Sequence, residues 1–189
     1  MDFYVTAIAA SGFGIGELEV FFRCIPAQPG IAFIVVSHLP RDKQSKLCEI
    51  VARNTSLPVQ RVLTNTRIAP DHVYVLAENT ILTVEDCTLL VTQRDPAEVI
   101  NTSIDTLFAS LAQNCKEKIV GIILGGMGAD GIKGATIIED NGGYVMVQKP
   151  DLSRSTEMAR NVAEKNSPHI ILPLEKMADH LMHHVAVNG

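Results

Sequence analysis

A serine, a histidine and an aspartate each follow an apolar run in this sequence. Ser11 lies in "AIAASGFG", His38 in "FIVVSHLP" and Asp130 in "IILGGMGADG". A hydroxyl, an imidazole and a carboxylate are the groups of an acyl-transfer triad, in which the carboxylate orients the histidine that activates the serine. Each residue alone also has a structural interpretation, because serine and aspartate often cap helices and a histidine at a strand end can be structural. The combination favours a serine hydrolase.

The glycine-rich segment around Asp130 also fits a dinucleotide-binding turn. Residues 126–131 read G-x-G-x-x-G, between an apolar run and a helix-compatible stretch, as in a Rossmann fold. Such a site needs an acidic residue at the end of the following strand, and that strand is predicted to end at Gln148. The missing acidic residue weakens the Rossmann interpretation, and a Rossmann-like oxidoreductase stays only as an alternative. The glycines are better explained by a tight turn that exposes backbone amides.

The elements that must position these residues are strands and helices in alternation. Continuous apolar runs at 3–9, 31–37 and 118–125 are typical of strands buried on both faces. Further strands are predicted at 142–148 and 169–173, a short antiparallel meander at 72–92, and helices at 14–25, 43–54, 103–114, 132–141, 156–165 and 174–184. This alternation predicts an α/β fold with a doubly wound, mainly parallel β-sheet and helices on both faces. The three candidate residues should meet at the carboxyl edge of that sheet.

Composition limits the class of protein. The 189 residues are 47% apolar and 20% charged, which suits a single globular domain spanning residues 1–189. The net charge of −5, without a basic cluster, argues against nucleic-acid binding. No apolar run approaches the roughly 20 residues of a membrane span. The first residues lack the basic stretch of a signal peptide, so we expect a cytoplasmic protein that does not insert into membranes.

The cysteines and histidines give no strong metal signal. The four cysteines are scattered without a C-x-x-C pair, so we expect buried, reduced thiols. His180 and His184 are four residues apart on a predicted helix; this spacing could bind a metal, but a solvated helix end is the simpler interpretation. We therefore expect neither a metal nor a cofactor. The polar stretch at 148–155 is a candidate mobile loop.

The three motifs together resemble those of the catalytic domain of CheB, the protein-glutamate methylesterase of chemotaxis receptors. The order Ser…His…Asp fits that family and differs from the Ser…Asp…His order of α/β-hydrolases. The segments "TSIDTLFASLA" at 102–112 and "PDHVYVL" at 70–76 add to a resemblance that runs from about residue 4 to 181. Stand-alone and methyltransferase-fused versions look most similar, through "PGIAFIVVSHL" and "NTSLPV".

This resemblance implies roles for individual residues. Ser11 would be the nucleophile, His38 the general base and acid, and Asp130 the orienting carboxylate. The backbone amides of Met127 and Gly12 would form an oxyanion hole. The implied reaction releases methanol from glutamate methyl esters on the helical cytoplasmic bundle of chemoreceptors, with deamidation of some glutamines. A regulatory or methyltransferase domain, fused or separate, is the further partner that the resemblance implies.

Two segments depart from the family pattern. The family commonly has Ser-Thr-Gly-Gly or Ser-Ala-Gly-Gly at the nucleophile, where this chain has Ser11-Gly12-Phe13-Gly14, so Phe13 is expected to narrow the site or to give it an apolar wall. A family Gly-Met-Pro-Arg motif corresponds only to "EMAR" at 157–160. No segment resembles a receiver domain, so we expect a stand-alone esterase or one domain of a longer protein. These departures keep open a catalytically silent signalling module of the same fold.

Overall fold

The computed structural model describes residues 2–41, 43–151, 156–166 and 168–189, without the side chain of Phe13. The predictions for the Phe13 side chain and for residues 152–155 of the 148–155 loop fall outside the described residues. The strands are β1 (Val5–Ala9), β2 (Ala32–Val36), β3 (Val59–Val62), β4 (Thr66–Arg67), β5 (His72–Leu76), β6 (Thr80–Glu85), β7 (Thr88–Gln93), β8 (Ile119–Ile123), β9 (Tyr144–Gln148) and β10 (Ile170–Leu172). The helices are α1 (Ile15–Arg23), α2 (Leu47–Ala52), α3 (Ser103–Cys115), α4 (Ile132–Asp140), α5 (Glu157–Lys165) and α6 (Leu174–Asn188), with 3-10 turns η1 (Gly12–Gly14) and η2 (Lys116–Lys118).

A seven-stranded parallel sheet forms the centre of the fold, in the order β10-β9-β8-β1-β2-β5-β3. The predicted doubly wound, mainly parallel sheet is confirmed. Strand β1 lies between β2 and β8, with Ala9 in register with Val36 on one side and Ile123 on the other. The strands that follow β1 in the chain are added on one side of it, and the strands from β8 onward are added on the other side. The strand order therefore reverses between β1 and β8, and the carboxyl ends of these two strands mark the topological switch point, where α/β sheets bind their ligands.

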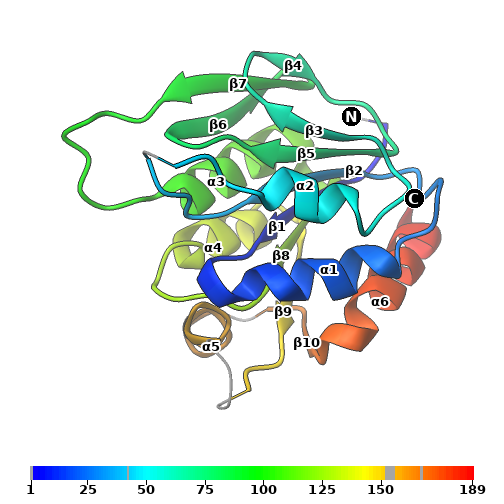
Figure 1. The fold of residues 1–189 in the computed structure, drawn as a ribbon. Coiled ribbons are helices and arrows are strands. Elements are labelled where there is room, and N and C mark those ends of the chain that lie inside the picture. The colour runs from blue at the N-terminus through cyan, green and yellow to red at the C-terminus, as the bar shows by residue number, and fades with distance from the viewer. Residues whose placement is uncertain (1, 42, 152–155, 167) are drawn as a thin grey trace.

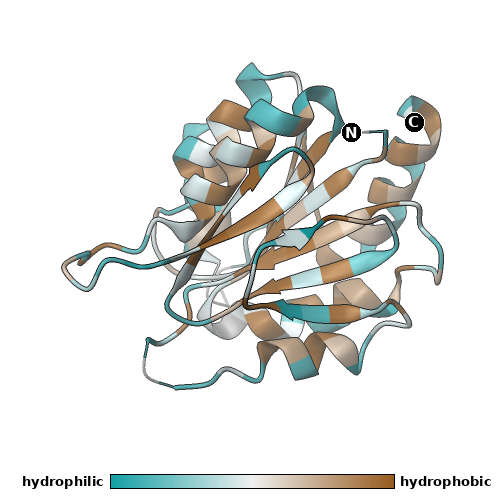
Figure 2. Cartoon of the chain, turned by 90° about the horizontal axis from the view of Figure 1, so that it is seen from above, coloured by the Kyte–Doolittle hydropathy of each residue, from teal (hydrophilic) through white to brown (hydrophobic). Residues whose placement is uncertain are grey.

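Side chains on the two faces of the sheet form two apolar cores. Along β1, Val5, Ala7 and Ala9 point into one core and Ile8 into the other, as the two-residue period of a strand requires. Helices α3, α4 and α5 cover the first face and α1, α2 and α6 cover the second (Figure 1). Figure 2 shows hydrophobic residues recurring along the strands in the interior of the fold, with paler residues between them. Burial on both faces is why these strands are continuous apolar runs in the sequence.

The predicted meander at 72–92 is only partly right. Strand β5 pairs in parallel with β2 and β3 in the main sheet, whereas β6 and β7 form an antiparallel hairpin in a small sheet of order β4-β7-β6. Burial explains the difference, because β5 is buried at four consecutive positions, whereas buried positions in β6 alternate with half-buried or exposed ones. The small sheet packs on α3 through Leu82, Val84 and Leu89. The chain leaves this small sheet at the end of β7 and then enters α3.

Two smaller expectations also change. All four cysteines are free, but Cys24 is exposed, so only Cys115 is a fully buried thiol. His180 and His184 are not a solvated helix end, because both pack on Tyr144. The Tyr144 hydroxyl lies 3.1 Å from His180 Nε2, and the His184 ring stacks at 4.0 Å from the tyrosine ring. No group of three or more metal-binding side chains occurs among the described residues, and no helix in that part of the chain could cross a membrane.

Candidate active site

The predicted histidine and aspartate meet at the carboxyl edge of the sheet. His38 follows β2, and Asp130 lies in the loop between β8 and α4. The His38 Nε2 atom lies 2.7 Å from Asp130 Oδ2, with the histidine side chain 26% exposed and the aspartate side chain 6% exposed. Shielding from water strengthens such a polar contact. Because Nε2 faces the carboxylate, Nδ1 is the ring nitrogen left to exchange a proton with a hydroxyl or a leaving group.

The carboxylate of Asp130 is also held by the first turn of α3. Its Oδ2 atom accepts a hydrogen bond from Ile104 N at 3.0 Å, and its Oδ1 atom accepts one from Asp105 N at 2.9 Å. These amides belong to a helix start, where backbone N–H groups have no partner within the helix. Asp130 therefore caps α3, a neighbour far away in the sequence, and not α4, which begins just after it. Three hydrogen bonds fix the carboxylate that faces His38.

Asp105 makes the reciprocal contact. Its Oδ1 atom accepts hydrogen bonds from Gly131 N and Gly134 N, both at 2.8 Å, so a residue of α3 caps α4. Burial first, and then the negative charge of Asp130, raises the pKa of Asp105 above the ordinary aspartate value. Sequence reasoning did not single out Asp105. Its only signal was an acidic residue in the first turn of a predicted helix, which is common.

Ser11 lies at the end of the neighbouring strand. It lies two residues after Ala9, the last residue of β1, its N–H donates to Gly125 O at 3.1 Å, and the residue is 7% exposed. It stands at the cap position of η1, but its side chain makes no capping hydrogen bond. Gly12 has a φ of +59°, a left-handed value that side chains other than glycine rarely adopt. The serine therefore sits on a sharp turn between strand and helix, with a hydroxyl that no cap engages.

The turn after β1 and the turn after β8 touch through their backbones. A Cβ atom at Gly14 would lie 2.1 Å from Gly125 O, so the contact requires glycine. Glu17 of α1, which is 5% exposed, accepts hydrogen bonds from Gly125 N at 2.5 Å and from Gln148 Nε2 at 2.8 Å. Sequence reasoning missed Glu17, although a carboxylate among the apolar residues of "GELEVFF" is a signal of a buried polar contact. The turn that carries Ser11 is thus held in contact with the loop that carries Asp130.

Two backbone amides near Ser11 have no hydrogen-bond partner among the described residues. Neither Gly12 N nor Met127 N donates to any described residue. Unpaired N–H groups beside a nucleophile can bind the oxygen of a tetrahedral intermediate. Both residues are exposed, and the Met127 residue is 59% exposed. The two predicted oxyanion donors therefore remain available to a ligand.

The "EMAR" segment supports the same loop from α5. Met158, which is fully buried, donates its N–H to Gly126 O at 3.0 Å. The carboxylate of Glu157 accepts a hydrogen bond from Gly128 N at 3.4 Å. The segment that departs from the family pattern therefore touches the backbone on both sides of Met127.

An open cleft of about 560 Å³ lies beside the His38–Asp130 pair. Met127 and Lys133 line it together with that pair, and Ser11 is not part of its lining. The register of β1 and β2 and the hydrogen bond from Ala10 N to Val36 O bring the segments that carry Ser11 and His38 side by side. No hydrogen bond joins Ser11 and His38 in the described part of the chain. Such bonds commonly tighten only when substrate binds.

Comparison with known proteins finds a matching family, similar proteins and a similar solved structure. A family described as "CheB methylesterase" matches residues 6–181. A Leptospira interrogans protein is 28% identical over 180 residues, which cover 95% of this chain and 93% of the relative. A Burkholderia lata protein named "Protein-glutamate methylesterase/protein-glutamine glutaminase 2" is 30% identical over 179 residues, which cover 94% of this chain and 53% of the relative. The crystal structure of the Thermotoga maritima CheB methylesterase catalytic domain superposes with a TM-score of 0.87 and 22% identity, covering 98% of this chain and 100% of that one.

Proposed function

This chain belongs to the CheB methylesterase family, and on that premise we propose that it hydrolyses glutamate methyl esters in proteins. The observation that carries the proposal is the 2.7 Å contact between His38 and Asp130 at the edge of the sheet where Ser11 follows the adjacent strand β1. Relatives are also named as protein-glutamine glutaminases, so we extend the proposal to glutamine side chains. An amide and an ester can be cleaved by the same acyl transfer.

The proposed mechanism uses a serine nucleophile. Ser11 Oγ attacks the ester carbonyl while His38 Nδ1 takes the hydroxyl proton, and Asp130 stabilises the resulting imidazolium. The oxyanion accepts hydrogen bonds from Met127 N and Gly12 N, each such donor contributing about 3 kcal/mol in serine hydrolases. His38 then protonates the methoxide, which leaves as methanol. A water molecule repeats the sequence on the acyl-enzyme and releases the glutamate.

The proposed substrate is the helical cytoplasmic bundle of a chemoreceptor. An ester on such a bundle stands on the surface of a helix, and an open cleft accepts it without unfolding the helix. We further propose that residues 1–189 form one catalytic domain, and that a regulatory or methyltransferase domain, fused or separate, is its partner.

The dinucleotide interpretation is the weaker candidate because of Asp130. Its carboxylate would stand beside a pyrophosphate bound at the same loop, and the two negative charges would repel. A catalytically silent module is the other alternative. It would keep this fold and the His38–Asp130 contact without ester turnover.

Methanol release from a methylated cytoplasmic fragment of a chemoreceptor tests the proposal. We expect release by the wild-type protein, together with covalent labelling of Ser11 by a fluorophosphonate. Absence of both methanol and label in the folded protein would overturn the esterase proposal and favour the silent module. Label at a different serine would overturn the assignment of the nucleophile.

A further inference from the structure

Exposed apolar side chains gather at the rim of the cleft. Among the seven large apolar residues that the described part of the chain exposes, Val99, Ile100 and Met127 are 95%, 74% and 59% exposed. Ile100 and Met127 line the same cleft as His38 and Asp130, and Val99 precedes Ile100 in the chain. Clustered exposed apolar residues commonly mark a binding surface, whereas scattered ones do not.

The loop that carries Val99 and Ile100 is anchored at both ends. It spans residues 94–102, joins β7 to α3, and extends away from the body of the fold (Figure 1). At the β7 end, Arg94, only 7% exposed, donates its N–H to Asn79 O at 2.9 Å, and its Nε donates to Glu98 Oε2 within the loop at 3.0 Å. At the other end, Asn101 Oδ1 accepts a hydrogen bond from Ser103 N at 3.0 Å. These contacts hold the loop without burying its apolar tip.

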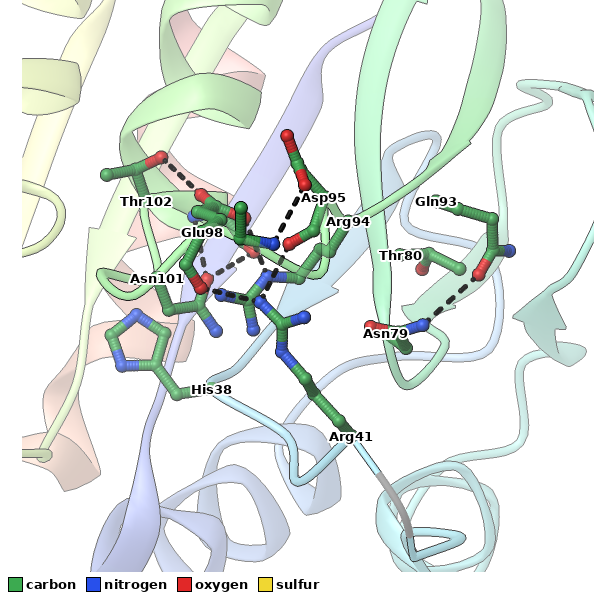
Figure 3. A network of polar contacts seen from close by, with 12 residues as sticks. His38, Arg41, Asn79, Thr80, Gln93, Arg94, Asp95, Glu98, Asn101 and Thr102 are labelled. Atoms are coloured by element: carbon green, nitrogen blue, oxygen red, sulfur yellow. Dashed lines mark hydrogen bonds and ion pairs between the residues drawn. The ribbon is translucent and has the colours of Figure 1, made fainter.

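Arg41 ties the middle of this loop to the active site. It lies three residues after His38, on the loop that follows β2, and its Nη2 donates to Asp95 O at 3.1 Å and to Glu98 O at 2.7 Å. Figure 3 shows the Arg41 side chain reaching the backbone of the 94–102 loop, with His38 on the same segment as Arg41. The position of Val99 and Ile100 is therefore set relative to the catalytic pair.

We propose that the 94–102 loop is a docking element for the protein that carries the ester. This inference rests on the proposed function. A helix that presents a side chain to Ser11 and His38 must lie across the rim, because Ile100 and Met127 border the cleft beside that pair. Val99 and Ile100 then pack against apolar side chains one turn from the ester, at the three- and four-residue spacing of a helix face. A small ester makes none of these contacts.

The first test measures binding without turnover. In a Ser11→Ala background, the dissociation constant for a methylated chemoreceptor cytoplasmic fragment is compared between the parent and a Val99→Ser, Ile100→Ser double variant. Loss of two apolar contacts should raise this constant about 10-fold or more. The matched control is Leu63→Ser with Val187→Ser, which removes two side chains that are 61% and 66% exposed elsewhere. The control should bind like the parent.

Arg41→Ala tests whether binding depends on the position of the 94–102 loop as well as on its exposed apolar side chains. This variant keeps Val99 and Ile100 but removes both hydrogen bonds to the loop, so binding should weaken about threefold to tenfold. Unchanged binding by the double variant would overturn the inference, as would an equal loss in the matched control. Failure of the parent to bind the fragment would also overturn it.

The second test uses proteins that retain Ser11 and a small ester, N-acetylglutamate γ-methyl ester. The Val99→Ser variant, at a residue outside the lining of the cleft, should keep its kcat/KM for this ester within about twofold while KM for the receptor fragment rises. A parallel loss on both substrates would show that the loop acts on the catalytic groups, and the inference would fall. Failure of the proposed function gives a different result, because the wild-type protein would then hydrolyse neither substrate.

Discussion

The two halves of the catalytic edge are fixed in different ways. On one side, Asp130 is held by His38 and by two amides of α3, so side-chain hydrogen bonds set its orientation. On the other side, the turn of Ser11 is set by backbone contact at Gly14, and its hydroxyl makes no capping bond. In the proposed mechanism the carboxylate must hold one orientation, and it makes three hydrogen bonds. The hydroxyl must move toward a substrate in that mechanism, and among the described residues it makes no capping bond.

This difference predicts two kinds of sensitivity. The carboxylate side should respond to changes of charge and hydrogen bonding at constant size. The nucleophile side should respond to the loss of one oxygen atom or the addition of one methyl group. The four substitutions below test the comparison, from the largest expected effect to the smallest.

Ser11→Ala should abolish ester hydrolysis. Loss of the nucleophile in a serine hydrolase lowers kcat on the order of 10⁴- to 10⁶-fold, and the far-UV circular dichroism should not change. Ser37→Ala is the control. Ser37 is 1% exposed, precedes His38, and its Oγ atom has no partner among the described residues, so its loss should leave methanol release near normal. Ester hydrolysis that survives Ser11→Ala would show that Ser11 is not the nucleophile.

Asp130→Asn should lower kcat/KM by about 10²- to 10⁴-fold. The amide keeps the size of the carboxylate but cannot stabilise the imidazolium, and in serine proteases the corresponding change costs about 10⁴-fold. At about 1.4 kcal/mol for each tenfold, the loss is roughly 3 to 5 kcal/mol of transition-state stabilisation. Steady-state kinetics on a methyl ester measure it. Near-normal hydrolysis combined with new affinity for NAD would contradict the esterase site and support the dinucleotide interpretation.

Gly14→Ala should separate the two turns. The added methyl group would lie 2.1 Å from Gly125 O, so we expect a loss of about 1–3 kcal/mol in the free energy of unfolding. A displaced Ser11 should also lower activity by about tenfold or more. Gly16→Ala in the same segment is the control, because nothing lies within 4 Å of its added Cβ. It should be neutral or stabilise by up to about 1 kcal/mol, and equal effects of both changes in chemical denaturation would contradict the steric argument.

Asp105→Asn should alter the pH dependence of stability. Because the folded-state pKa of Asp105 is raised, the folded protein keeps this proton to a higher pH than the unfolded chain. The free energy of unfolding therefore falls as pH rises from the ordinary aspartate pKa of 3.8 through the raised value. Asparagine does not titrate and keeps an acceptor for Gly131 N and Gly134 N, so this decline should disappear.

Denaturation curves at pH 4 and pH 7 measure that effect. Asp105→Ala is the comparison variant, because it removes the acceptor of both hydrogen bonds that cap α4. It should lower the free energy of unfolding at both pH values by about 1–2 kcal/mol. The same difference between the two pH values in wild type and Asp105→Asn would show that Asp105 does not titrate with a raised pKa.

The sequence determined the three strands that carry Ser11, His38 and Asp130. Strands β1, β2 and β8 are buried on both faces at every position, and this gives continuous apolar runs that a local pattern detects. The polar residues after these runs could then be assigned to one edge, because parallel strands share a carboxyl end. The roles of those residues remain predictions.

Tertiary structure decided what holds these residues in place. Asp130 could have capped its own helix, but its carboxylate bonds the amides of α3, 25 and 26 residues away. Glu17 reaches Gly125 across 108 residues, and Arg41 reaches the loop of Val99 and Ile100 across 54 and 57. The sequence pattern wrongly placed β5 in a meander, because its pairing with β2 and β3 depends on the whole sheet and leaves no local signal. Side-chain periodicity is a local property that burial imposes on one segment, whereas a hydrogen bond between segments exists only once packing brings them together.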